Sequence, residues 1–196
     1  MDNYRNFLDL KARALKKLEE SQVENNIDDR ILPVLNMINA LDDYYTSSSC
    51  AGRIVLLEIP SIGDKKNAVF LGKWHRKIEP EEVLEASKKA SKGFLWLLAQ
   101  SPIIHIGAKT LVAADKMLKL AISAGFKHSG LKSIGKNIVV EVVSTERLDA
   151  PIGREGRLFC DNEYIDLLVE ICNEIMDRSI LKLSRFEDKL EKLHNF

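Results

Sequence analysis

The sequence predicts an α+β protein in which a mixed β-sheet packs against helices and a long helix closes the chain. Three observations lead to this class. Apolar residues recur at helical spacing near both ends, short β-branched runs fill the middle, and the two kinds of segment alternate. Some neighbouring runs look like hairpins, so the sheet is expected to combine antiparallel with parallel pairs.

The length and composition fit one domain. Single domains commonly run to about 100–200 residues, and 196 residues with 45% apolar and 30% charged side chains are ordinary globular values. We therefore expect a single domain over residues 1–196, with residues 161–196 as a C-terminal helical extension.

Two helices are expected in the first quarter of the chain. Residues 4–20 carry an apolar stripe with basic residues between its members, which leaves Lys11 on the solvent side. Residues 31–41 form the second, with Asp28 or Asp29 as its cap and Pro33 in its first turn.

The middle of the chain alternates strands and helices. Two runs separated by Pro60 and Gly63 predict a hairpin, and Ser101-Pro102 divides the apolar run 94–108 into two strands or one bent strand. The expected elements are strands over 54–59, 68–71 and 137–145, and helices over 79–92 and 110–124.

Asp161 can cap a final helix whose apolar stripe changes register before Leu183. This change indicates either a bend or a second packing partner. The apolar stripe that begins at Leu183 is also compatible with a homo-oligomer formed through this helix.

Residues 46–53, TSSSCAGR, combine small and hydroxyl-bearing residues with one arginine just before a strand. Such residues can bring the backbone close to a ligand, and Arg53 can hold a carboxylate or phosphate. The plainer alternative is a loop whose serines only turn the chain. The candidate binding residues here are Ser47, Ser48, Ser49, Cys50, Gly52 and Arg53.

Three histidines are candidate bases, because imidazole titrates near working pH. His105 lies in an apolar run and would otherwise be a hydrogen-bonded core residue, whereas His128 lies in a more polar segment beside Ser129 and Gly130. His75 follows Trp74, which can stack on a base while neighbouring cations meet phosphate, or can simply end a strand.

Residues 144–153, STERLDAPIG, form a second candidate ligand loop or an ordinary strand exit, with Ser144 and Thr145 as candidate contacts. The three cysteines are widely spaced, so neither a disulfide framework nor a metal site is expected. No run is apolar enough for a membrane span or signal peptide, which favours a cytoplasmic protein.

Four ordered blocks within residues 25–153 resemble the tRNA wybutosine-synthesising protein 3 family, in an archaeal stand-alone form. They are TSSSCAGRI after DDRILPVLNMINALDDYY, then GKWHR, then SPIIHIGAKTLVAADKMLKLAISAGFKHSGL, then VVEVVSTERLDAPIG. The glycine-rich motifs of nucleotide-binding folds, GxGxxG and the P-loop, are absent from the sequence.

The resemblance implies an S-adenosylmethionine-dependent methyltransferase. Its substrate would be the N(4) ring nitrogen of a demethylwyosine with an aminocarboxypropyl side chain, at position 37 of tRNA(Phe), beside the anticodon. No metal is implied. Because the formal net charge is zero, local basic clusters within residues 73–77 and 127–157 would have to contact the tRNA. The alternative is a non-catalytic tRNA-binding module that assists another modification enzyme.

Overall fold

The computed structural model describes residues 2–24 and 27–194. Contacts group the chain into two compact units. Unit 1 comprises Met1–Ala51, Pro102–Thr145 and Ser179–Phe196, and unit 2 comprises Gly52–Ser101 and Glu146–Arg178. Each unit is described by itself, and the expectation of one domain over residues 1–196 stays a prediction.

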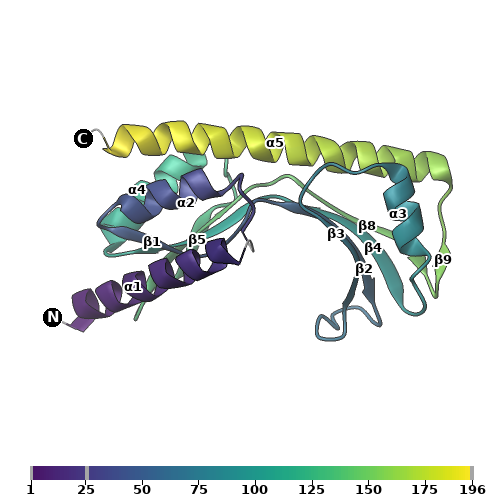
Figure 1. The fold of residues 1–196 in the computed structure, drawn as a ribbon, viewed down its shortest axis with the longest axis horizontal. Coiled ribbons are helices and arrows are strands. Elements are labelled where there is room, and N and C mark those ends of the chain that lie inside the picture. The colour runs from purple at the N-terminus through teal and green to yellow at the C-terminus, as the bar shows by residue number, and fades with distance from the viewer. Residues whose placement is uncertain (1, 25–26, 195–196) are drawn as a thin grey trace. The chain divides into compact units, whose positions relative to one another are not determined.

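Unit 1 contains a four-stranded antiparallel sheet in the order β1-β5-β7-β6. Helices α2 and α4 pack on one face of this sheet, and α1 runs past β1 on the other side (Figure 1). The helices are α1 (Asp2–Val23), α2 (Leu32–Ala40) and α4 (Leu111–Ser123), and the strands are β1 (Tyr44–Cys50), β5 (Ile103–Ala108), β6 (Gly130–Ser133) and β7 (Ile138–Val143).

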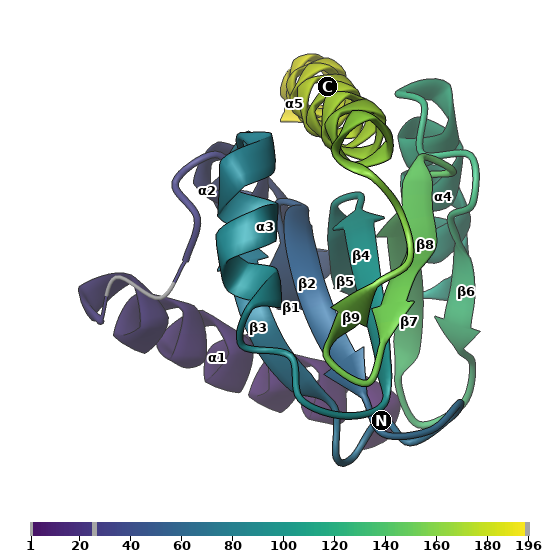
Figure 2. The same cartoon turned by 90° about the vertical axis from the view of Figure 1, so that its right-hand side faces the viewer.

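Unit 2 contains a five-stranded antiparallel sheet in the order β3-β2-β4-β8-β9. One face is covered by α3 and by the first part of α5 (Figure 2). The helices are α3 (Pro80–Ser87) and α5 (Asn162–His194), and the strands are β2 (Arg53–Ile59), β3 (Val69–Trp74), β4 (Phe94–Gln100), β8 (Arg147–Arg154) and β9 (Arg157–Leu158).

The α+β class and the long C-terminal helix are confirmed. The sheet differs from the expected mixed one, since every strand pair in the described ranges is antiparallel and the strands form two sheets. The physical reason lies at Ser101-Pro102. Proline cannot donate a ladder hydrogen bond, and here it separates β4 of one sheet from β5 of the other.

The predicted helices are confirmed as α1 to α5, although some local details change. Thr110 caps α4 by accepting from the Ala113 N–H at 3.1 Å, and Asp161 accepts from the Tyr164 N–H at 2.9 Å. Neither Asp28 nor Asp29 caps α2, because Ile31 is the N-cap residue and no side chain caps it; Asp28 instead pairs with the Arg30 guanidinium. Lys11, expected toward solvent, donates to the Leu41 carbonyl at 2.5 Å.

The change of stripe register in α5 corresponds to two packing partners. Leu168 and Cys172 pack in the core of unit 2, whereas Leu183, Phe186 and Leu190 pack in the core of unit 1. The stripe that suggested a homo-oligomer is therefore buried inside the chain's own core, and the oligomer itself stays a prediction.

Two segments expected as loops are strands. Residues 46–50 belong to β1, which lies at a sheet edge, and residues 147–153 belong to β8. The serines are tolerated in β1 because it is an edge strand and their side chains are exposed to solvent. Pro151 is tolerated in β8 because a bulge interrupts the ladder beside Trp96.

Candidate functional site

A line of four polar side chains crosses the sheet of unit 1. Ser48 Oγ lies 2.6 Å from His105 Nδ1, and His105 Nε2 lies 2.6 Å from Glu141 Oε2. Lys132 Nζ reaches the same carboxylate oxygen at 3.0 Å. The four residues come from β1, β5, β7 and β6, so every strand of this sheet contributes one member. We call them the polar row.

Strand alternation places the polar row opposite the core. Ile104 and Ile106 on β5, and Val140 and Val142 on β7, are fully buried in the core of unit 1. His105 and Glu141 lie between these residues and point to the other face. Because their backbones are direct cross-strand partners, the imidazole and the carboxylate meet side by side.

A β-bulge at Ser47 aligns Ser48 with the histidine. Buried Thr46 is fixed by Asn39, whose side chain donates to Thr46 Oγ1 at 2.9 Å and accepts from the Thr46 N–H at 2.8 Å. The register then shifts, so that Ser48 pairs with His105. Bulges commonly re-aim a side chain in this way.

The charges of the polar row define its hydrogen-bond directions. Hydrogen bonds from His105, and then from Lys132, hold the pKa of Glu141 below its usual value. Glu141 is therefore a carboxylate that only accepts, and His105 Nε2 must carry a proton. In the neutral tautomer that carries this proton on Nε2, Nδ1 is the acceptor for the Ser48 hydroxyl, and this form of the ring can receive a proton.

A pocket of ≈200 Å³ adjoins the serines of β1. Its other wall includes Lys17 and Ser21 of α1, together with the apolar residues Ala14, Leu18 and Ile27. Ser47, Ser48 and Ser49 line it, and all three are exposed. Hydroxyls beside one cation are suited to a small polar ligand that carries a carboxylate.

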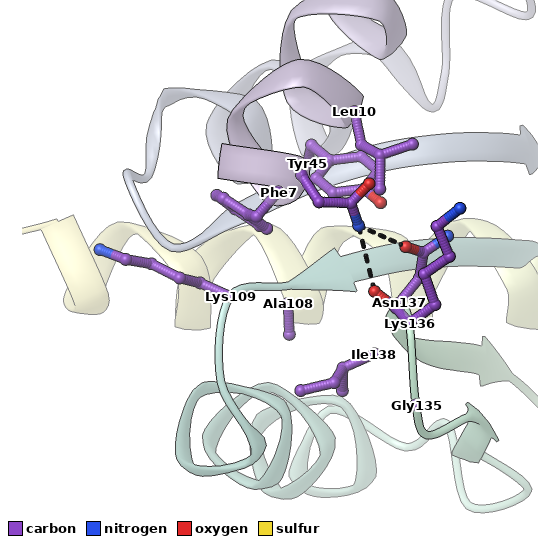
Figure 3. A pocket seen from close by; sticks show the side chains of 10 residues that line it. Phe7, Leu10, Tyr45, Ala108, Lys109, Gly135, Lys136, Asn137 and Ile138 are labelled. Atoms are coloured by element: carbon purple, nitrogen blue, oxygen red, sulfur yellow. Dashed lines mark hydrogen bonds between the residues drawn. The ribbon is translucent and has the colours of Figure 1, made fainter. Parts of the chain in front are cut away.

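A second pocket in unit 1 has a volume of only ≈30 Å³, about that of one water molecule. Figure 3 shows the aromatic rings of Phe7 and Tyr45 on one side and Asn137 on the other. The Asn6 amide donates to the Lys136 carbonyl at 3.1 Å and to Asn137 Oδ1 at 2.9 Å. These bonds attach α1 to the β6–β7 turn, so the contact serves packing.

Other predicted candidates in unit 1 lie outside the polar row. Ser129 donates to the Phe126 carbonyl and accepts from the Val143 N–H, so it fixes a turn. Buried Ser144 accepts from Lys182 Nζ at 2.6 Å. His128 and Thr145 are exposed, Cys50 is half-buried as a free thiol, and Gly130 pairs with Glu141 at the start of β6.

The remaining candidates belong to unit 2. Gly52 adopts φ +98° at the start of β2, a conformation that favours glycine, and its carbonyl lies 3.2 Å from His75 Nδ1. Arg53 Nε donates to Gln100 Oε1 at 2.7 Å. Trp74 packs half-buried against the core that α3 and α5 cover.

Sequence reasoning missed Glu141 and Lys132. The signal for Glu141 was present in the run IVVEVV, because one acidic residue among valines on a strand must point away from the core. Its partner His105 was predicted as a candidate, but a strand order was needed to bring the two together.

Within the described residues 2–24 and 27–194, no helix combines the length and apolar character needed to cross a bilayer. No group of three or more His, Cys, Asp or Glu side chains within the same ranges is arranged to hold a metal ion.

Comparisons with known proteins identify close relatives over nearly the whole chain. The model of the family "Methyltransferase TYW3" matches residues 9–192. A Thermococcus kodakarensis protein named tRNA(Phe) 7-((3-amino-3-carboxypropyl)-4-demethylwyosine(37)-N(4))-methyltransferase 1 is 48% identical over 189 residues, which covers 96% of either chain. A Methanocaldococcus jannaschii protein with the corresponding name is 40% identical and covers 95% of this chain and 98% of its own.

Solved structures agree with the fold. The PH1069 protein from Pyrococcus horikoshii superimposes with a TM-score of 0.92 at 48% identity, over 97% of this chain and 98% of its own. A hypothetical protein from Aeropyrum pernix gives a TM-score of 0.74 at 30% identity, over 85% of this chain and 98% of its own.

Proposed function

This chain belongs to the methyltransferase TYW3 family, and we propose that it performs the reaction for which its relatives are named. It is a methyltransferase that acts on N(4) of 7-(3-amino-3-carboxypropyl)-4-demethylwyosine at position 37 of tRNA(Phe), in wybutosine-type modification. The observation that carries this function is 48% identity over 96% of both chains. The alternative of a non-catalytic tRNA-binding module is not favoured, because these relatives are named as enzymes.

The methyl donor in this proposal is S-adenosylmethionine, which supplies an electrophilic methyl group when bound. Its carboxylate, ammonium and ribose hydroxyls need charged and hydroxyl partners. The pocket beside Ser47, Ser48 and Ser49 offers such groups, and Lys17 adds the cation that a carboxylate requires. These residues fit the donor, so we assign its amino-acid end to this pocket.

His105 is the proposed base. A ring nitrogen that bears a proton must lose it when it is methylated, and His105 Nδ1 can receive that proton directly or through the Ser48 hydroxyl. The resulting imidazolium lies 2.6 Å from the Glu141 carboxylate, whose negative charge stabilises it. Glu141 also orients the ring, so it acts as a positioning residue.

His75 and His128 stay as alternative bases, although each has less support. His75 Nδ1 lies 3.2 Å from the Gly52 carbonyl. His128 is exposed in a turn. General bases usually need a second group that orients them, and among the three histidines this chemistry favours His105.

The other predicted binding residues keep their proposed roles as contacts to donor or tRNA. Cys50 and Gly130 adjoin members of the polar row along β1 and β6. Gly52, Arg53 and Trp74 lie in unit 2, and Ser129, Ser144 and Thr145 lie in unit 1. The anticodon region of tRNA(Phe) is the proposed partner, and the cytoplasm the proposed location.

Methyl transfer tests the function directly. The full chain is incubated with labelled S-adenosylmethionine and tRNA(Phe) from a strain that lacks the corresponding gene, and the nucleosides are analysed by mass. We expect one methyl group to be added to a wyosine-type nucleoside. If folded protein binds the tRNA and the donor but transfers nothing, the proposal is wrong.

A further inference from the structure

The sheet of unit 2 has one face that carries aromatic, apolar and cationic side chains. Its other face is occupied by the core with α3 and α5. Residues that alternate with this core along β2 and β4 point the opposite way, among them Arg53, Leu57, Trp96 and Gln100. In the described part of unit 2, no helix packs on that side; Val55 on β2 is buried there, whereas Phe70 and Lys73 on the edge strand β3 are exposed. We call it the open face.

Cross-strand pairing arranges the open face in rows. Arg53, Gln100 and Arg147 form one end, and Phe70, Leu57 and Trp96 form a parallel aromatic and aliphatic row. The Arg53 guanidinium lies 5.7 Å from the centroid of the Phe70 ring and is also fixed by Gln100. These contacts leave its remaining N–H groups available and hold the cation in a preorganised position.

A second cation and aromatic pair lies at the other end of the open face. The Arg154 guanidinium is 4.9 Å from the centroid of the Phe94 ring, and the two residues are direct cross-strand partners. Lys73 is exposed beside Val55, between these ends. Asp149 is the acidic member of the same face and pairs with Arg147.

The aromatic row also contains one exposed ring, and one buried donor that the described residues leave without an acceptor. Phe70 is 53% exposed, although a phenyl ring gains most from burial. The buried Trp96 indole N–H has no acceptor among the residues that the structure describes. That N–H is closed to solvent and cannot reach a ligand, whereas a ligand that covers the Phe70 ring would bury exposed apolar surface.

We propose that the open face binds an unpaired segment of the tRNA substrate, with bases stacked on Phe70 and phosphates on Arg53, Lys73 and Arg154. Aromatic side chains interleaved with cations are typical of single-strand recognition, whereas a duplex hides the faces of its bases. Although Arg147 pairs with Asp149 and Arg154 lies 3.5 Å from Glu155, Arg53 and Lys73 add positive charge to the open face, which complements phosphate. Arg53 then contacts tRNA and not the donor. This inference rests on the proposed function, since it assumes a tRNA substrate.

Binding tests the open face without depending on catalysis. The full chain is titrated into fluorescein-labelled tRNA(Phe) transcript, a single-stranded anticodon-loop oligonucleotide, and a blunt RNA duplex, and anisotropy is measured without methyl donor. Phe70→Ala should weaken binding of the tRNA and the oligonucleotide by about tenfold, because one base stack is lost. Lys73→Gln should lower the slope of log K against log salt by about 0.7.

Matched controls lie on the helix-covered side of unit 2. Tyr164→Ala and Arg178→Gln alter an exposed aromatic and an exposed cation on α5, and both should bind as wild type. Unchanged melting temperatures establish that the variants fold. The inference is overturned if the Phe70 and Lys73 variants bind like the controls, or if the duplex binds as tightly as the single strand. In either case, methyl transfer by the wild-type protein would leave the proposed function intact.

Discussion

At the scale of single residues, the polar row explains why a histidine sits in an otherwise apolar strand. His105 is held between a hydroxyl donor and an ionised carboxylate, both at 2.6 Å. A base oriented in this way has a defined lone pair and a partner for the charge that it acquires. The sequence predicted His105 and Ser48 as candidates, but their contact with Glu141 depends on strand order, which local patterns do not contain.

Glu141→Gln keeps the shape of this side chain and removes its charge. We expect kcat to fall by about tenfold to a hundredfold while KM for tRNA changes little, because the carboxylate stabilises a charge that develops only during reaction. Steady-state methyl transfer gives both constants. Asp115→Asn, at an exposed ion pair on α4, is the matched control and should leave the rate unchanged. A rise in KM alone would assign Glu141 to binding.

Glu82 offers a second test at this scale. Arg76 donates to its two oxygens at 2.9 and 2.7 Å, and mainly this bond lowers the pKa of Glu82 to about 2. A carboxyl group whose pKa is lowered in the folded state stabilises the fold at pH values above its ordinary pKa of 4.5. This contribution disappears as the pH falls toward 2. NMR titration of Arg76→Gln should find a pKa closer to 4.5, whereas Arg178→Gln should not change it.

At the scale of elements, the helices followed from sequence more directly than the strands. Capping and apolar periodicity are local, so α1, α4 and α5 could be predicted. Strands β1 and β8 were mistaken for loops because serine, proline and charged residues are rare within strands. Both are stabilised by pairing with distant segments, β5 and β4 respectively, and such pairing is not visible in either segment alone.

The second half of α5 is expected to stabilise unit 1. Phe186 is fully buried and contacts Phe126 at a ring-centroid distance of 5.6 Å. Phe186→Ala should lower the free energy of unfolding by about 3–5 kcal/mol, through lost burial and a cavity. Chemical denaturation measures this loss. Leu181→Ala, at a site that is 57% exposed, should change stability by less than about 0.5 kcal/mol.

Gly107 illustrates how an element positions the polar row. A side-chain Cβ at this position on β5 would lie 2.1 Å from the ring of Tyr45, so only glycine lets this ring lie across the strand. Gly107→Ala should lower the melting temperature and reduce methyl transfer, since β5 carries His105 two residues away. Gly130→Ala is the control for melting temperature alone, because no atom lies within 4 Å of its Cβ position. Equal stability of both variants would contradict this packing role.

At the scale of the whole molecule, a formal net charge of zero means that tRNA must be recognised by local groups. The sequence indicated clusters within residues 73–77 and 127–157, and Lys73 and Arg154 from these ranges lie on the open face. The aromatic residues beside them were not recognised as candidates. Phe70 and Phe94 look like ordinary strand residues until the covered and uncovered faces of the sheet are known.

The most direct test of the account is the single-turnover rate of methyl transfer to tRNA(Phe) for His105→Asn, measured beside His128→Asn at saturating tRNA and donor. If His105 is the base, its variant should be slower by about a hundredfold or more, and the His128 variant should match wild type. A wild-type rate for His105→Asn would contradict the catalytic role of the polar row.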